Sequence, residues 1–102
     1  MKQKHSIIQF SRGCLICGNP NTERHHLIYG NANRQLSDQD GLYVDLCEEH
    51  HKGGNDSVHL NPTIAKWSRI AGEMAWINTY CQGMSIEQGI AQFRARYGKN
   101  YL

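Results

Sequence analysis

Two close pairs of metal-binding side chains constrain what this chain of 102 residues can fold into. In each pair the two ligands are separated by two residues, and Gly13 and Gly18 flank the first pair with the backbone freedom that a tight turn needs. Structural zinc sites often take their four tetrahedral ligands as two such pairs. The spacing therefore predicts a structural zinc ion. Its ligands would be Cys14 with Cys17 and Cys47 with His50.

The alternative interpretation is that these thiols are ordinary buried side chains or form disulfides in a secreted protein. Residues 1–5 are basic, but the apolar stretch behind them is only Ile7-Ile8, which is too short for a signal peptide or a membrane span. We therefore expect a cytoplasmic protein without a membrane partner. In that reducing compartment a metal site is favoured over a disulfide.

The length of the chain indicates one small α+β domain over residues 1–102. A zinc knuckle and metal core are expected in residues 14–60 and a helical extension in residues 61–98. A chain this short buries little apolar surface, so a bound metal adds useful stability. The formal charge is only +2, with basic residues concentrated before residue 35 and after residue 60. Because charge runs usually face solvent, this pattern alone is a weak sign of nucleic-acid binding.

Apolar periodicity predicts two strands in the first half. Leu42, Val44 and Leu46 alternate with polar positions, as a half-buried strand should. Residues 24–29 are the expected partner strand, and the turn-rich residues between the two predict a long loop. Residues 48–52 allow one or two helical turns.

Two helices are predicted in the second half. Asn61 caps the first, Pro62 occupies its first position, and Ser85 with Gln88 forms a capping box for the second, which Gly98 ends. An apolar stripe at helical spacing on the first helix is expected to be core. The stripe consists of Ile64, Trp67, Ile70, Ala71, Met74, Ile77 and Cys81.

Four further histidines lie close in sequence to the zinc ligands, and a purely structural zinc module has no use for them. They are His25, His26, His51 and His59. Adjacent residues on a helix diverge by about 100°, so His50 can face the zinc while His51 faces a second site. A second metal with two or three imidazole ligands, beside an imidazole that can accept a proton, is a hydrolytic arrangement.

The order of these motifs resembles the HNH endonucleases with the ββα-metal fold. The resemblance is carried by Cys14-x-x-Cys17, Arg24-His25-His26-Leu27-Ile28, Asp40-Gly41-Leu42 and Leu46-Cys47-x-x-His50-His51. More narrowly, the chain is similar to small phage- and prophage-encoded HNH proteins, which also carry a Val-His such as Val58-His59 and an ending like residues 93–102.

The resemblance implies a metal-dependent endonuclease that hydrolyses DNA phosphodiester bonds in phage recombination, repair or packaging. His26 would be the general base, His25 and His51 ligands of a catalytic divalent cation, and His59 a third ligand or a phosphate contact. That cation would be Mg²⁺, Mn²⁺, Ni²⁺ or Zn²⁺, in addition to the structural Zn²⁺. Either a dimer or a phage recombination or packaging protein is expected to help place so small an enzyme on its substrate.

Several residue roles stay open in the sequence. Asp40 occupies the place of the family's middle asparagine, with Asp38 and Asn33 as rivals. Arg24 and Arg34 are candidates to hold the DNA backbone, and either fits equally well as a surface arginine.

Consecutive strand residues point to opposite faces, so His25 and His26 can share a site only where the strand is twisted, bulged or ending.

The competing hypothesis is a non-catalytic zinc-binding module that binds nucleic acid or a protein partner through its helical half. Under it, His25 or His26 could replace His50 as the fourth zinc ligand.

Overall fold

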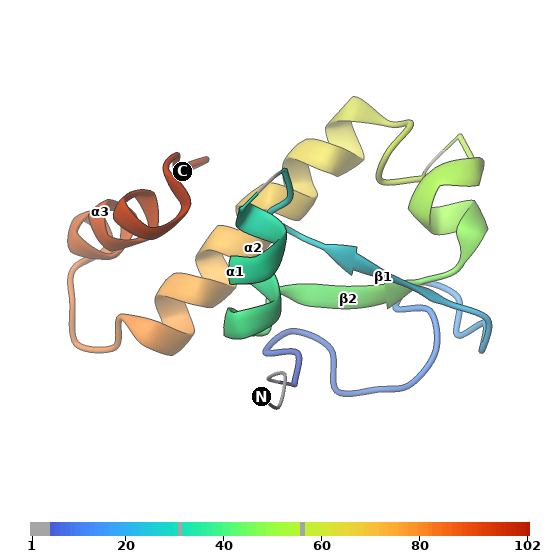
Figure 1. The fold of residues 1–102 in the computed structure, drawn as a ribbon, viewed down its shortest axis with the longest axis horizontal. Helices are drawn as coiled ribbons and strands as arrows, with labels where there is room; N and C mark the ends of the chain where they lie inside the picture. The colour runs from blue at the N-terminus through green and yellow to red at the C-terminus, as the bar shows by residue number, and fades with distance from the viewer. Residues whose placement is uncertain (1–4, 31, 56) are drawn as a thin grey trace.

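Two short antiparallel strands and four helical segments make up the fold in the computed structural model, which describes residues 5–30, 32–55 and 57–102 (Figure 1). The expected α+β class is confirmed. No helix within those ranges is long and apolar enough to cross a membrane. In chain order the elements are β1 (Glu23–His26), α1 (Asn33–Asp40), β2 (Tyr43–Leu46), η1 (Glu49–Gly53), α2 (Pro62–Tyr80) and α3 (Ile86–Tyr97).

Both predicted strands are present, although each is shorter than expected. β1 pairs antiparallel with β2, with Glu23 opposite Leu46 and His26 opposite Tyr43. Val44 and Leu46 are buried as predicted, but Tyr43 is buried too. The Arg24 guanidinium lies 3.9 Å from the centre of the Tyr43 ring and covers it. The simple inward and outward alternation is therefore wrong at this position.

The connection between the strands contains the helix α1, where a loop was expected. The Ser37 hydroxyl donates a hydrogen bond of 2.6 Å to the Ile28 carbonyl, and Gly41, with a φ of 77°, ends the helix. A polar segment of eight residues is too short to be a stable helix by itself. Contacts with distant parts of the chain therefore stabilise α1, and local sequence patterns do not predict such contacts.

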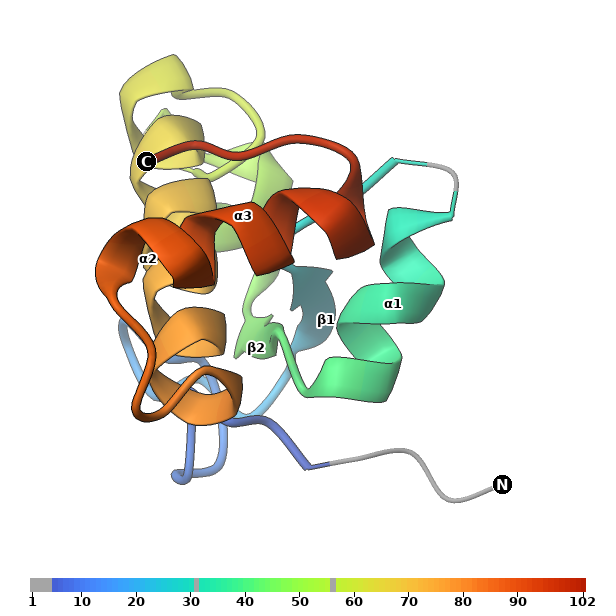
Figure 2. The same ribbon diagram turned by 90° about the vertical axis from the view of Figure 1, so that its left-hand side faces the viewer.

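The two predicted C-terminal helices are confirmed together with their caps. The Asn61 side chain accepts hydrogen bonds from the first turn of α2. Ser85 and Gln88 form the expected capping box of α3. The helix α3 lies across α2, as Figure 2 shows.

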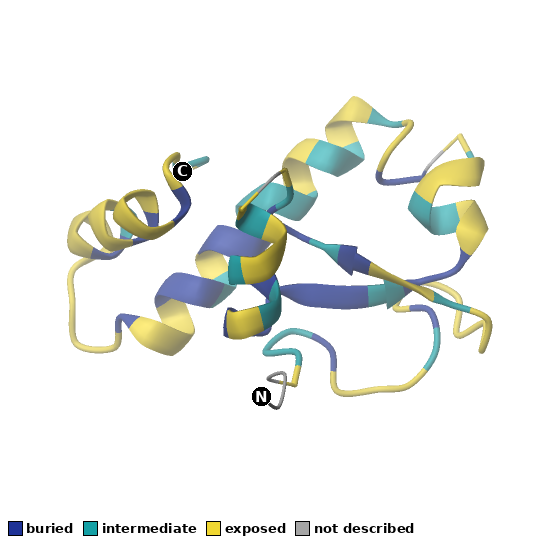
Figure 3. Cartoon of the chain, in the orientation of Figure 1, coloured by how far each residue is buried: buried dark blue, intermediate teal, exposed yellow. Residues whose placement is uncertain are grey.

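The buried face of α2 differs from the predicted stripe. Trp67 and Met74 are 63% and 55% exposed, whereas Ile77 and Cys81 are buried as predicted. Glu73 and Trp76, which lie outside the predicted stripe, are buried too. Figure 3 shows both buried and exposed positions along α2. Glu73 can be buried because one of its carboxylate oxygens accepts hydrogen bonds from the backbone amides of residues 101 and 102. Gly72 lies against Leu27, where a Cβ would come within 3.0 Å of the Leu27 Cβ. The hydrogen bonds to Glu73 and the close approach of Gly72 to Leu27 thus help to bury a face of α2 that the apolar pattern of the sequence does not predict.

Asp40 connects α1 to both C-terminal helices. Its carboxylate accepts hydrogen bonds from the Trp76 indole at 2.8 Å, the Tyr97 hydroxyl at 2.7 Å and the Arg96 guanidinium at 2.8 Å. Burial, together with the neighbouring carboxylate, raises the pKa of Tyr97, so its hydroxyl stays protonated as a donor. These contacts border a core cluster that includes Ile28, Trp76, Phe93 and Tyr97.

We predict that Asp40→Asn lowers the free energy of unfolding by about 2–4 kcal/mol, because it removes the charge from a buried acceptor shared by three donors. Urea unfolding followed by circular dichroism measures the change. Glu87→Gln, an exposed acid on α3, is the matched control. Equal effects of the two substitutions would contradict the role given to Asp40.

Candidate metal centres and histidine pocket

The four predicted zinc ligands converge on one point. One ligand atom each from Cys14, Cys17, Cys47 and His50 lies within 4.8 Å of the others, so this cluster can hold a metal ion such as zinc. Cys14 and Cys47 are buried, and no disulfide joins them. The competing assignment, in which His25 or His26 replaces His50, is not what the structure shows.

The first pair of ligands sits on a tight knuckle. Gly13 and Gly18 have φ angles of 83° and 79°, which confirms the need for glycine on either side of the pair. The buried Gln9 side chain donates to the Gly13 carbonyl at 2.7 Å and accepts from the Asp45 amide at 2.7 Å. Through this amide the knuckle is attached to β2, whose end delivers Cys47.

The separations within the cluster fit a zinc tetrahedron. The Cys17 and Cys47 sulfurs are 3.7 Å apart, and His50 Nδ1 lies 3.2 Å from the Cys47 sulfur and 3.6 Å from that of Cys14. Bond lengths of about 2.3 Å to sulfur and 2.0 Å to nitrogen give edges of about 3.8 Å and 3.6 Å. Burial raises the pKa of the Cys14 thiol, but backbone hydrogen bonds led by that of Cys47 outweigh it and lower the pKa to about 6. The thiolate form that zinc binds is thereby favoured.

We predict that Cys47→Ala loses stoichiometric zinc and unfolds residues 14–60, because it removes a ligand that lies at the end of β2. Zinc released to a chromogenic chelator and far-ultraviolet circular dichroism measure the two effects. Cys81→Ala is the control, since Cys81 is buried in the helical half, outside the cluster. A Cys47→Ala protein that still holds one zinc per chain would show that the ligand set is different.

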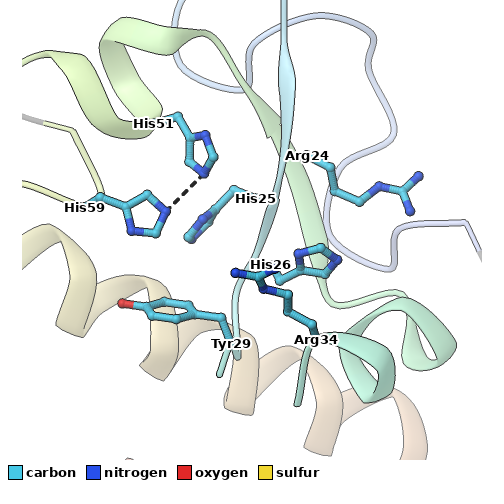
Figure 4. Close-up of a pocket in the computed structure, with 7 residues that line it drawn as sticks. All are labelled: Arg24, His25, His26, Tyr29, Arg34, His51 and His59. Atoms are coloured by element: carbon cyan, nitrogen blue, oxygen red, sulfur yellow. Dashed lines mark hydrogen bonds between the residues drawn. The ribbon is translucent and has the colours of Figure 1, made fainter. Parts of the chain in front are cut away.

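Three of the additional histidines form a second cluster. One ring nitrogen each of His25, His51 and His59 lies within 4.8 Å of the others, an arrangement that can also hold a metal ion (Figure 4). The Nε2 atoms of His51 and His59 are 3.1 Å apart. Two nitrogens bound to one ion at about 2.0–2.1 Å lie at about this separation.

Backbone and side-chain contacts hold this cluster in place. The His59 amide donates to the His51 carbonyl at 3.1 Å, so a segment eight residues later runs beside η1. Glu23 Oε1 accepts from His51 Nδ1 at 2.8 Å, which leaves His51 Nε2 as the ligand atom. His25 Nε2 contacts the Ser68 hydroxyl of α2 at 3.2 Å.

Burial and neighbouring charges favour the neutral forms of His25 and His59, which can bind a cation. Burial, reinforced by repulsion from His51 and His59, lowers the pKa of His25 to about 3. Burial likewise lowers the pKa of His59, with the neighbouring His51 as the next contribution. Neutral imidazoles present the lone pairs that metal binding requires.

His26 belongs to a separate contact in the same pocket. Its Nε2 lies 2.9 Å from Asp38 Oδ1. Because an ionised carboxylate only accepts, Nε2 carries the proton and Nδ1 of the neutral ring is left as an acceptor. β1 ends at His26. Figure 4 shows His25 on one side of the strand and His26 on the other, and both line the same pocket.

These side chains surround a pocket of about 250 Å³. Its lining residues are Arg24, His25, His26, Tyr29, Arg34, His51 and His59. Both candidate DNA-binding arginines therefore line the pocket, but they differ in their contacts. Arg24 is paired with Asp38 at 3.0 Å, whereas Arg34 is exposed on the first turn of α1.

The structure corrects the expected role of Asp40. Its carboxylate faces Trp76, Arg96 and Tyr97, and the acid that contacts His26 is the rival candidate Asp38. Two residues along a helix are about 200° apart, so only one of these acids can face the pocket.

Sequence reasoning missed several residues that support the pocket. Glu23 is hydrogen-bonded to His51, and Ser68 is hydrogen-bonded to His25. Tyr29 accepts a hydrogen bond from Arg69, and its ring packs near those of His25 and His59. Ser68 and Arg69 come from α2, more than 35 residues from the partners they contact. No local motif marks such residues.

Searches of protein-family models, of curated proteins and of solved structures each returned no match to this chain.

Proposed function

We propose that this protein is a metal-dependent HNH endonuclease that hydrolyses phosphodiester bonds of DNA. The observation that carries this proposal is the juxtaposition of His25, His51 and His59 with His26 in one pocket, where His26 is in turn bonded to Asp38. A group that can hold a metal and an imidazole oriented by a carboxylate to act as a base are two parts that hydrolysis of a phosphodiester uses.

The three-histidine cluster would hold the catalytic cation. When bound there, a divalent cation supplies positive charge against the scissile phosphate and the departing 3′ oxygen. Glu23 and Ser68 would fix the orientation of His51 and His25, while the remaining ring nitrogens face the cation. Imidazole ligation suits Zn²⁺, Ni²⁺ or Mn²⁺ better than Mg²⁺, which prefers oxygen ligands.

His26 would act as the general base. With Nε2 donating to Asp38, Nδ1 is free to take a proton from a water molecule that attacks phosphorus. Asp38 also stabilises the imidazolium that results, as a carboxylate partner does in other His–Asp pairs. Asp38 Oδ1 also accepts a hydrogen bond from the Arg24 guanidinium, so the carboxylate is held by two donors, Arg24 and His26.

Arg34 is the residue best placed to receive a substrate phosphate. It is exposed at the rim of the pocket, whereas the guanidinium of Arg24 is occupied by Asp38 and Tyr43. Phosphate contacts of this kind position DNA without reading its sequence. A phage recombination or packaging protein would remain a suitable partner for target choice.

We predict that purified wild type nicks supercoiled plasmid when Mn²⁺ or Ni²⁺ is added, and that His26→Ala lowers the rate by about 100- to 10,000-fold through loss of the base. Gel electrophoresis of the plasmid forms measures the rate. His5→Ala, an exposed histidine outside the pocket, is the matched control.

Both variants should keep their zinc and their circular dichroism spectrum. Loss of folding in His26→Ala would place that residue in the structural site instead. No cleavage by any of the three proteins, with zinc intact, would favour the competing zinc-binding module.

We further predict a second metal site on the zinc-loaded protein that is weaker than the first. Isothermal titration with Ni²⁺ should detect one additional ion, which His51→Ala abolishes and Glu23→Gln weakens about 10-fold or more through the lost carboxylate contact. Glu87→Gln should bind as wild type does. A protein that binds a single metal ion under all conditions would count against catalysis at this pocket.

A further inference from the structure

We propose that the exposed apolar face of α2 is the contact surface for a second copy of this chain, in an antiparallel two-fold dimer. We call this face the α2 stripe. Its residues are Trp67, Ala71, Met74 and Asn78. The proposal does not depend on the nuclease activity.

The α2 stripe has a pattern that a helix uses when another helix covers it. Its members follow one another at alternating steps of three and four residues, the spacing of a helix–helix seam. Yet Trp67 and Met74 are 63% and 55% exposed in the monomer, and Ala71 and Asn78 are exposed as well. Scattered exposed apolar side chains are ordinary, but a spaced row ending in an exposed tryptophan and methionine indicates a contact surface.

The chemistry of the α2 stripe favours a second copy over other occupants. None of its four side chains is charged, so it offers nothing to a polyanion such as nucleic acid, which is bound through basic residues. The same neutrality means that two copies of the face meet without electrostatic repulsion. The small side chain of Ala71 at its centre allows two helices to approach closely.

The order of residues along α2 suits a two-fold axis. Ala71 lies at the middle, with Trp67 one turn before it and Met74 one turn after it. Antiparallel pairing about Ala71 places Trp67 over the partner's Met74, and the reciprocal contact follows from symmetry. The distance from Trp67 to Met74 along the helix is about 10 Å at 1.5 Å per residue, so both contacts form at once.

A groove beside Met74 can receive the indole ring. It has a volume of about 390 Å³ and is lined by Met74, Ala75, Ile77, Asn78 and Ile86. The same chain thus carries a protruding aromatic side chain and, two helical turns later on the same face, an apolar groove. Such a self-complementary pair of features is what an isologous interface requires.

The available area predicts a weak dimer. Side chains as large as Trp67, Met74 and Ile86 offer roughly 150–250 Å² each, and more than half of each is exposed. Together they contribute on the order of 400 Å² per copy, against about 800 Å² in a standard interface. We therefore expect a dissociation constant of about 10–100 μM.

Sedimentation velocity of the zinc-loaded full chain, over a concentration range that spans this constant, tests the proposal. Wild type should pass from monomer to dimer. Trp67→Glu and Met74→Lys should each weaken association by about 100-fold or more, because a central anchor is lost on both sides of the axis. Phe10→Glu, which alters a side chain that is 88% exposed outside α2, should dimerise as wild type does.

An equimolar mixture of Trp67→Glu and Met74→Lys provides the sharper test. Antiparallel pairing brings the new glutamate against the new lysine at one contact and keeps the native Trp67–Met74 contact at the other. The mixture should therefore associate where each variant alone does not. A wild type that stays monomeric throughout, a dimer that persists in both variants, or a mixture that stays monomeric would each overturn the proposed arrangement. All three variants should retain the wild-type circular dichroism spectrum.

Discussion

The convergence of Cys14, Cys17, Cys47 and His50 is the constraint on which the rest of the structure depends. It joins the N-terminal knuckle, the end of β2 and the first turn of η1. The buried residues around it form a small cluster containing Leu27, Val44, Leu46 and Val58, which is too limited to position a site by itself. Because His51 directly follows His50, the orientation of the structural cluster also sets the position of the second one. The same helical turn therefore contributes His50 to one cluster and His51 to the other.

A second connection runs through α1. Asp40 is held by three side chains of α2 and α3, while Asp38, on the same helix, holds His26. Ser37 attaches the helix to the chain just after β1. The C-terminal helices thus determine where the partner of His26 lies, although neither Arg96 nor Tyr97 lines the pocket. In the proposed endonuclease, the helical half would act through packing as well as through its own surface.

Local sequence rules predicted the elements that carry their own signals. The strands have alternating apolar residues, α2 and α3 have capping residues, and the zinc ligands have a characteristic spacing. The helix α1 was missed because its stability comes from contacts with residues distant in sequence. The buried face of α2 was misassigned for a related reason: Glu73 is buried through a hydrogen bond to the C-terminal backbone, and Gly72 through a close approach to Leu27.

The sequence by itself determined which residues form the first Cys/His cluster, because close spacing of cysteine and histidine limits their geometry whatever the rest of the chain does. It also marked His25, His26, His51 and His59 as more histidines than one structural site needs. Only the tertiary structure decided how they divide, with three facing one another and His26 facing Asp38. It also decided which acid of α1 reaches the pocket and which apolar face of α2 remains exposed. These outcomes depend on contacts between separate elements, and the energy of such contacts is not encoded in any local pattern.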